Sequence, residues 1–330
     1  MKKIKLNFCG FWNSYNKENN LFTRILSKHF DVEISEQPDF VICSNRGKPF
    51  EYMKYNCPRI MFMGENMSPD FTVFDYVIGF DFLEFGDRYF RLPFGFYFDD
   101  AKPWIPELLT EDDAYKILKE KKYFANFIYG HESSKKMRES IFEKLSGYKD
   151  VVSPGSFLNN LEIPESTKKR CTWQEKAEYL RLSKFTIAGD SIEYPGFVTE
   201  KIVQPFQKHS IPIYWGSPRI DEDFNIESFV WCKSFEDLDC MLEEIRYLDT
   251  HDDAYVHMLM QCPLKEQLFL EKKYEELEKF LVDIFSQETE MAYRRVRYFA
   301  AEQHEGYLRE YAERYERTPR IIHKLKDYLK

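Results

Sequence analysis

The stretch over residues 182–217 constrains the fold most, because its pattern predicts a strand, a loop, a helix and a second strand in close succession. Residues 184–188 and 211–215 are short β-rich runs, and Tyr-Pro-Gly at positions 194–196 marks a turn between them. Units with this order are typical of α/β domains with parallel sheets.

The helix of this stretch is expected to begin at Thr199, a good N-cap residue, with Glu200 and Lys201 in its first turn. Pro205 is expected to kink the helix or end it early. A helix N-terminus with a lysine beside it, at the carboxyl end of a strand, suits a phosphate group. An ordinary strand–helix–strand unit with surface charges remains the alternative.

Composition excludes several classes of protein. The chain has 330 residues, which favours two domains, and 43% of them are hydrophobic, so global disorder is excluded. The net charge of −9 argues against general nucleic-acid binding. Seven cysteines, with no CxxC pair among them, indicate reduced structural thiols in a reducing compartment.

The N-terminus carries lysines but no long apolar run behind them, so we interpret it as a first strand and not as a signal peptide. No segment reaches the length of a membrane span. A membrane-anchored layout is therefore not expected, and a cytoplasmic location is.

Hydrophobic runs separated by helical segments predict two successive α/β domains facing a cleft, over residues 1–118 and 119–285. Residues 286–330 are predicted to form a helical C-terminal extension. Tyr307, Tyr311 and Tyr315 recur at four-residue spacing in it, so this stripe is expected to pack on a neighbouring helix or domain. Residues 320–330 are either a helix in weak peripheral contact with a membrane or a solvated terminal helix.

Three separated blocks resemble one known family. They are MFMGENMSPDFTVFDYVIGF at 61–80, MRESIFEKLSGYKDVVSPGSFLNN at 137–160, and the stretch at 182–217 with its VTEKI and IPIYWG runs. Together they resemble the α-1,3/α-1,4-fucosyltransferases, especially the soluble bacterial members.

The resemblance implies a GT-B-like fold, in which two Rossmann-like domains bind the acceptor and the sugar nucleotide respectively. It implies an inverting transfer of L-fucose from GDP-fucose to a GlcNAc-containing glycan, with an α-1,3 linkage favoured and no metal required. The absence of an export signal suggests that this transfer occurs on the cytosolic side of a membrane.

The catalytic base implied by the resemblance is Glu65, which follows a predicted strand and Gly64. The alternative is a structural carboxylate that caps the next turn. Trp12 and Asn66 are the candidate acceptor-binding residues, since sugars stack on aromatic faces; most of the other aromatic residues are expected to be core.

Arg138 and Lys201 match the family's diphosphate-binding pair, and Glu200 matches the residue that hydrogen-bonds donor hydroxyls. The alternatives are a surface charge for Arg138 and simple complementarity to the helix dipole for Glu200. The histidines form no HExxH motif, and the acidic run at 221–223 is expected to be a solvated turn rather than a metal site.

The third block departs from the family pattern. The family's AFENS is replaced by Ala-Gly-Asp-Ser-Ile at 188–192, and Phe197 stands where a tyrosine is common. The remaining candidate donor-binding residues lie in the same loop: Asp190, Ser191, Tyr194, Phe197 and Thr199. These changes keep two alternatives open, a related GDP-sugar donor and a degenerate homologue that binds without catalysis.

Overall fold

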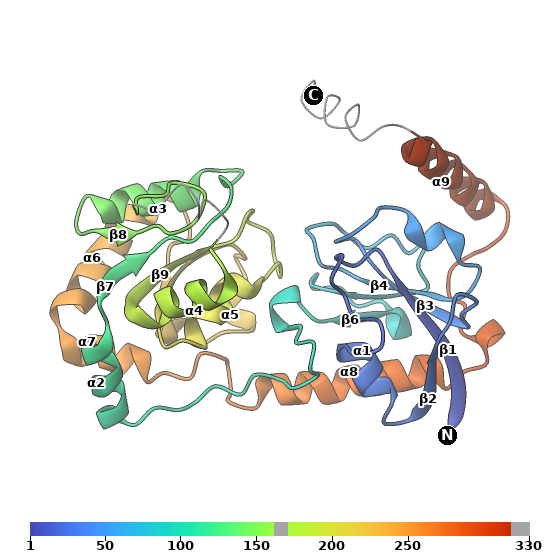
Figure 1. The fold of residues 1–330 in the computed structure, drawn as a ribbon, viewed down its shortest axis with the longest axis horizontal. Coiled ribbons are helices and arrows are strands. Elements are labelled where there is room, and N and C mark those ends of the chain that lie inside the picture. Colours follow the sequence, from blue (N-terminus) through green and yellow to red (C-terminus); the bar gives the residue numbers. More distant parts are fainter. Residues whose placement is uncertain (162–170, 318–330) are drawn as a thin grey trace. The chain divides into compact units, whose positions relative to one another are not determined.

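The computed structural model describes residues 1–161 and 171–317, which divide into two compact units. The first contains residues 1–92, 97–102 and those from Tyr274 onward, and the second contains residues 93–96 and 103–273. Each unit is built on one parallel sheet (Figure 1). The two predicted Rossmann-like domains of a GT-B-like fold are therefore confirmed, while the cleft between them stays a prediction.

The sheet of the first unit has six parallel strands in the order β2-β1-β3-β4-β5-β6. Asn20 caps the one α-helix between these strands through a capping box with Thr23. The other connections among the described residues are loops and short 3₁₀ turns, in place of the expected helices. The elements are β1 (Lys2–Cys9), α1 (Leu21–Leu26), β2 (Phe30–Ile34), β3 (Phe40–Ser44), β4 (Arg59–Phe62), β5 (Tyr76–Gly79) and β6 (Tyr89–Arg91).

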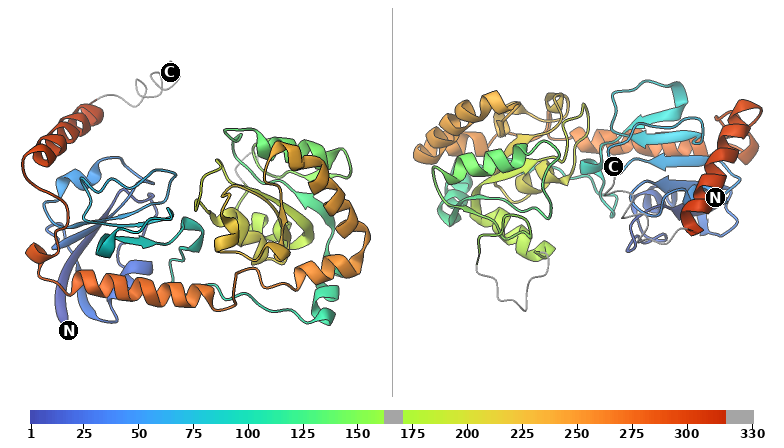
Figure 2. Two further views of the ribbon diagram at one scale, coloured as in Figure 1. Left: turned by 180° about the vertical axis from the view of Figure 1, so that it is seen from behind. Right: turned by 90° about the horizontal axis from the view of Figure 1, so that it is seen from above.

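The C-terminal helices α8 (Phe269–Phe285) and α9 (Ala300–Arg317) bear on the predicted domain boundaries. Leu277, Leu281 and Ile284 of α8 are buried, and Phe285 lies 4.6 Å from Phe40 of β3 between ring centroids. Figures 1 and 2 show α8 running along this sheet. The residues from Tyr274 onward therefore belong with the first unit, unlike the predicted boundary at 285 and the separate extension after it.

A buried charge network also ties the C-terminal segment to the first sheet. Asp75 accepts hydrogen bonds from the backbone N–H groups of Arg59 (2.8 Å), Arg294 (2.8 Å) and Arg295 (3.0 Å), and it forms an ion pair with the Arg295 guanidinium. Arg59 donates to Glu305 of α9 at 2.9 Å. Because all three charges of the Asp75, Arg59 and Arg295 side chains are buried, each depends on its partners.

The predicted packing of the tyrosine stripe is largely wrong. Tyr307 is 70% exposed and Tyr311 is 56% exposed, although the rings of Tyr311 and Tyr315 do contact Phe50. Charged contacts hold α9 instead, including the bond from Arg309 to the Met53 carbonyl at 2.6 Å. The proposed membrane-surface helix at 320–330 lies outside the described residues.

The second unit has five parallel strands in the order β11-β10-β9-β7-β8. The strand runs predicted at 184–188 and 211–215 are confirmed as β9 and β10. The strands are β7 (Tyr123–Asn126), β8 (Val151–Val152), β9 (Ser183–Gly189), β10 (Ile211–Trp215) and β11 (Val230–Trp231). The helices are α2 (Glu111–Glu120), α3 (Met137–Ser146), α4 (Trp173–Leu182), α5 (Glu200–Phe206), α6 (Leu238–Thr250) and α7 (Asp252–Leu259).

The two faces of the second sheet serve different purposes. Ile141 of α3 and Ile245 of α6 share a hydrophobic core with Phe185 and Ile187 of β9. Because side chains alternate along a strand, Thr186 points to the opposite face, toward α4 and α5. Polar side chains from this second face and from α3 line one cavity.

Candidate active site

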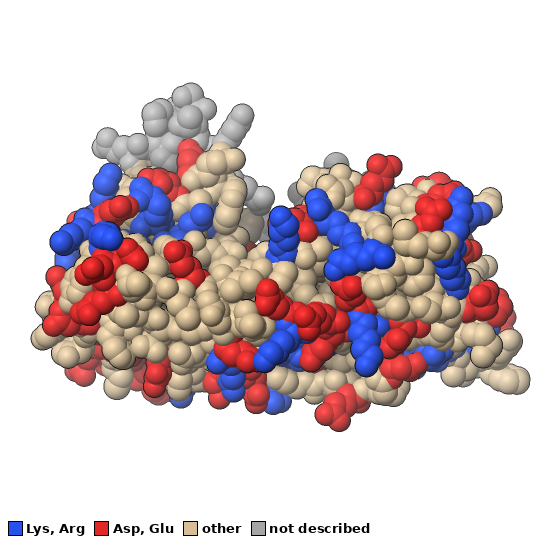
Figure 3. Space-filling model, turned by 90° about the horizontal axis from the view of Figure 1, so that it is seen from below, with Lys and Arg blue, Asp and Glu red and all other residues tan. Residues whose placement is uncertain are grey.

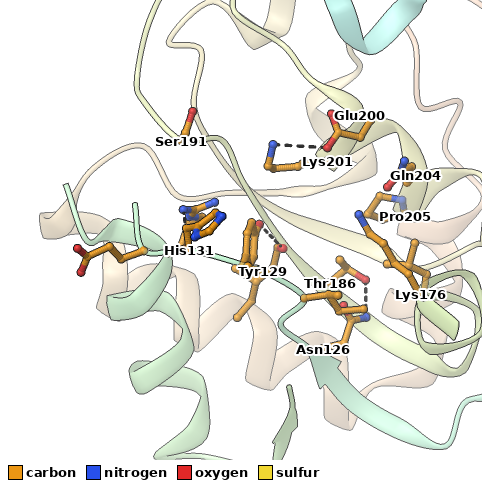
Figure 4. Close-up of a pocket in the computed structure, with 16 residues that line it drawn as sticks. Asn126, Tyr129, His131, Lys176, Thr186, Ser191, Glu200, Lys201, Gln204 and Pro205 are labelled. Carbon is orange, nitrogen blue, oxygen red and sulfur yellow. Dashed lines mark hydrogen bonds and ion pairs between the residues drawn. The ribbon is translucent and has the colours of Figure 1, made fainter. Parts of the chain in front are cut away.

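A cavity of about 360 Å³ lies in the second unit, beside the adjacent strands β7 and β9 (Figure 4). From β7 the chain continues to the edge strand β8, and from β9 it continues to β10 on the other side. This is the topological switch point at which open α/β sheets bind ligands. The volume falls in the range of small-molecule sites. Its lining includes Asn126, Tyr129, His131, Arg138, Lys176, Thr186, Ser191, Glu200, Lys201 and Gln204.

Arg138 is the most deeply held charge of this cavity, with 4% of its surface exposed. Its guanidinium lies 4.2 Å from the centre of the Tyr129 ring and donates a 3.1 Å bond to the His131 carbonyl. Its Nε has no hydrogen-bond partner among residues 1–161 and 171–317. The interpretation of Arg138 as a surface charge is therefore wrong. Its buried Nε–H group is available to donate a hydrogen bond to a ligand.

Gly189 makes the position of Arg138 possible. A Cβ atom at residue 189 would lie 2.5 Å from Arg138 Cγ, well inside contact distance. The departure from the family pattern at this position therefore has a structural reason, because any side chain here would displace the stem of the arginine. Tyr129 completes the support, since its hydroxyl donates to the Ile187 carbonyl at 2.8 Å.

The start of α5 provides Glu200 and Lys201. Thr199 is the N-cap, as predicted, and accepts a hydrogen bond from the Lys201 N–H. The Lys201 ammonium lies 3.2 Å from Thr199 Oγ1 and 3.6 Å from Glu200 Oε1. The helix ends one residue after Pro205, also as predicted, and has only seven residues.

Four of the eight predicted donor-binding residues line the cavity: Arg138, Ser191, Glu200 and Lys201. The other four, Asp190, Tyr194, Phe197 and Thr199, do not belong to the lining. Phe197 and Thr199 are buried, and Tyr194 is half-buried.

Asp190 was predicted to bind the donor, but it does not line the cavity and its carboxylate bonds to other residues of the fold. It is fully buried, accepts a short hydrogen bond from Thr199 Oγ1 and accepts a second from the Tyr214 hydroxyl at 3.1 Å. Burial raises the pKa of Asp190 to about 6, although the nearby Lys201 opposes this shift. The carboxylate thus holds Thr199, the N-cap residue of α5, in place through this hydrogen bond.

Sequence reasoning missed several residues of the cavity. Lys176 and Leu180 are four residues apart on one face of α4, and Gln204 occupies the corresponding side of α5. The Asn126 amide donates to Thr186 Oγ1 at 2.8 Å, which leaves its oxygen as the unengaged end. The one available signal was the i, i+4 spacing of Lys176 and Leu180 on a predicted helix.

In the first unit, Glu65 follows β4 at the carboxyl edge of the sheet, and its side chain is 55% exposed. Asn45 and Arg46, which follow the neighbouring strand β3, hold this segment. Asn45 Oδ1 accepts from the N–H groups of Gly64 (2.9 Å) and Glu65 (3.1 Å), and Arg46 lies 3.1 Å from Glu65 Oε1. The predicted base is therefore an oriented, accessible carboxylate.

Trp12 lies after β1 at the same edge of this sheet. Its ring is half-buried and contacts Phe11, Tyr15 and Tyr97 at centroid distances of 5.7, 5.1 and 5.9 Å. Phe11 is buried, as expected of a core ring, whereas Tyr15 and Tyr97 are partly exposed, as Trp12 is. Asn66 is also half-buried, directly after Glu65.

Within the described ranges, no group of three His, Cys, Asp or Glu residues is placed to hold a metal ion. In the acidic run at 221–223, Glu222 pairs with Arg219 at 2.9 Å and Asp223 is buried. No described helix is both long and apolar enough to span a bilayer. On the face shown in Figure 3, basic and acidic side chains are interspersed, without a large basic patch.

Comparison with known proteins adds to this geometry. Residues 6–98 match the model of the alpha-(1,3)-fucosyltransferase FucT N-terminal domain, and residues 118–261 match the glycosyltransferase family 10 (fucosyltransferase) C-terminal model. An alpha-(1,3)-fucosyltransferase FucT of Helicobacter pylori is 30% identical over 299 residues, which cover 79% of this chain and 60% of the relative. A Drosophila melanogaster alpha-(1,3)-fucosyltransferase B is 28% identical over 198 residues, with 55% and 43% covered.

Solved structures of fucosyltransferases are also similar to this chain. A crystal structure of an alpha1,3-fucosyltransferase with GDP-fucose superposes with a TM-score of 0.64 at 26% identity, covering 85% of this chain and 90% of that one. The chain spans less than two thirds of the length of the curated relatives that it matches first.

Two parallel α/β units, one with a cationic cavity at its switch point, define a GT-B glycosyltransferase fold. The chain belongs to glycosyltransferase family 10, the fucosyltransferases.

Proposed function

We propose that the protein transfers L-fucose from GDP-fucose to a hydroxyl of a GlcNAc-containing glycan, in α-1,3 linkage and with inversion at the anomeric carbon. The observation that carries this proposal is the presence of Arg138, Glu200 and Lys201 in one cavity at the switch point of the second sheet. The likeness to an alpha1,3-fucosyltransferase structure with GDP-fucose supports the choice of donor.

The leaving diphosphate needs positive charge, and two side chains of the cavity supply it. Arg138 presents a planar fork that is already fixed by Tyr129 and His131, while Lys201 adds a point charge. Charges that are fixed before the reaction stabilise a developing anion without reorganisation. The chemistry proposed here therefore requires no metal ion.

The reaction is a single in-line displacement. The acceptor oxygen attacks the anomeric carbon, the bond from that carbon to the phosphate oxygen breaks, and GDP leaves with the bonding electrons. The proton of the acceptor hydroxyl passes to the carboxylate of Glu65, which acts as general base. Glu200 is proposed to hold hydroxyl groups of the donor.

The altered segment at 188–192 is compatible with donor binding. Gly189 gives space to Arg138, and Asp190 faces Thr199 and Tyr214 instead of the cavity. A related GDP-sugar remains the alternative donor, and a panel of GDP-sugars in the assay below distinguishes it.

The test is GDP release from GDP-fucose in the presence of Galβ-GlcNAc acceptors, with wild type beside Glu65→Gln. Loss of the base is expected to lower turnover by roughly 10²–10⁴-fold and to leave GDP affinity unchanged. Glu84→Gln, an exposed carboxylate of the same unit, is the matched control. Equal rates for wild type and Glu65→Gln would remove Glu65 as base, and GDP binding without turnover on any acceptor would indicate a degenerate homologue.

A further inference from the structure

The cavity extends beyond the residues that the diphosphate and the donor hydroxyls require. Arg138 donates to the His131 carbonyl, so the arginine of the proposed diphosphate pair lies on the His131 side. Figure 4 places Lys201 near the middle of the cavity and Glu200, Gln204 and Lys176 on the side away from His131 and Ser191. If phosphates bind Arg138 and Lys201 and the ribose follows at Glu200, the base lies at Lys176 and Gln204.

The Lys176 ammonium group has no hydrogen bond or ion pair with the part of the chain that the structure describes. It extends from α4 into the lining, close enough to Glu200 and Lys201 for both to affect it. Burial lowers the pKa of Lys176 and Lys201 lowers it further, while Glu200 opposes these effects. A partly desolvated ammonium group gains most from an acceptor oxygen on a ligand.

Gln204 offers the complementary group. Its side-chain oxygen is buried and has no hydrogen-bond donor within residues 1–161 and 171–317. A buried acceptor without a partner costs free energy that a ligand N–H group would recover. The side of the cavity away from His131 thus combines a cationic donor with an unengaged acceptor.

We propose that Lys176 and Gln204 select guanine as the base of the sugar nucleotide, an inference that rests on the proposed function. Lys176 donates to the O6 and N7 acceptors of guanine, and Gln204 accepts from its N2 amino group. Adenine presents an amino group where guanine has O6, so Lys176 disfavours it. Leu180 and Pro205 provide apolar walls for the purine faces.

The experiment is isothermal titration of the full chain with GDP, IDP, which lacks the 2-amino group, and ADP. Wild type is expected to bind GDP about tenfold or more tightly than either analogue, because one good base contact discriminates by roughly 5- to 150-fold. Lys176→Met should reduce the preference for GDP over ADP to what the Gln204 contact with the 2-amino group supplies, and Gln204→Leu should reduce GDP affinity to that for IDP. Lys119→Met on α2 and Gln174→Leu on α4, both exposed, are matched controls, and thermal unfolding reports folding.

Each outcome decides a separate question. Absence of binding by all three nucleotides at millimolar concentration overturns the proposed donor site itself. GDP binding that weakens together with ADP binding in Lys176→Met assigns that lysine to the diphosphate and overturns base selection. Equal GDP and IDP affinities that Gln204→Leu leaves unchanged overturn the role of Gln204.

Discussion

The cavity of the second unit and the carboxyl edge of the first sheet present their candidate side chains in opposite ways. Arg138 is buried and held by an aromatic face and a carbonyl, whereas Glu65 is more than half exposed and held by one arginine. The first arrangement fits a charged nucleotide that must be desolvated, and the second fits a base that must reach varied acceptor hydroxyls.

The proposed roles assign nucleotide binding and acceptor activation to different units, which makes the two separable by substitution. The residues proposed for the nucleotide belong to the second unit, and those proposed for the acceptor belong to the first. Substitutions in one unit should therefore leave the property assigned to the other unchanged.

The largest expected effect is on the stability of the first unit. Asp75→Ala leaves the Arg295 guanidinium buried without its nearest carboxylate and removes the acceptor of three backbone N–H groups, which should cost about 3–5 kcal/mol and impair turnover through loss of fold. Asp87→Ala, which removes the exposed partner of Arg294, should cost less than about 1 kcal/mol. Urea unfolding measures both, and a GDP affinity that falls in parallel with folding of the first unit would contradict the assignment of nucleotide binding to the second unit.

Next in size is the loss of the buried guanidinium. Arg138→Leu should lower turnover by roughly 10²–10³-fold, the usual effect of removing a fixed charge from a developing anion, and should weaken GDP binding. Arg138→Lys should recover only part, because lysine lacks the fork. Arg181→Leu, on the exposed surface of α4, is the control. Normal GDP affinity in Arg138→Leu would contradict the proposed site.

Asp190 should give the second unit a distinctive pH dependence. Its pKa is about 6 in the fold, against 3.8 when unperturbed, so the folded state retains a proton that the unfolded state releases. Stability should therefore fall as pH rises from about 4 to about 6 and then level off, by up to ~3 kcal/mol. The free energy of unfolding, measured across this pH range, should depend less on pH in Asp190→Asn than in wild type. An unchanged pH dependence in the variant would show that another group causes it.

A smaller effect on GDP binding is expected from the methyl group that Gly189→Ala adds. Gly189→Ala should displace Arg138 and weaken GDP binding by roughly tenfold, as overpacking by about 1–2 kcal/mol implies. Gly147→Ala is the control, since its Cβ would make only ordinary contacts of 3.5 Å and beyond. Titration with GDP separates the two variants.

The smallest change is expected at the acceptor side of the first unit. Trp12→Ala should raise the KM for the acceptor about fivefold, from the loss of a stacking surface of about 1 kcal/mol, and leave GDP affinity intact. Trp12→Phe should be intermediate. Initial rates at varied acceptor concentration measure this, and an unchanged KM would assign Trp12 to the core cluster.

The local features of the fold could be predicted from sequence, because they depend on neighbouring residues. Alternating and buried apolar runs predicted β1, β9 and β10, and residue type predicted the cap at Thr199. Asp190 could not be placed, because it meets Tyr214 only once β9 and β10 pair in their observed register. The support of Glu65 by Asn45 and Arg46 also depends on strand order, which spacing does not reveal.

The way the C-terminal segment completes the first unit has a consequence for synthesis on the ribosome. Arg59 and Glu305 lie 246 positions apart, and Asp75 and Arg295 lie 220 apart, so the nascent first sheet emerges long before its charge partners and its covering helix α8 are translated. The second unit, which ends at residue 273, can fold before the C-terminal elements of the first unit are translated. We therefore expect the first-made half to be the last to become native, and to need protection from aggregation in the interval.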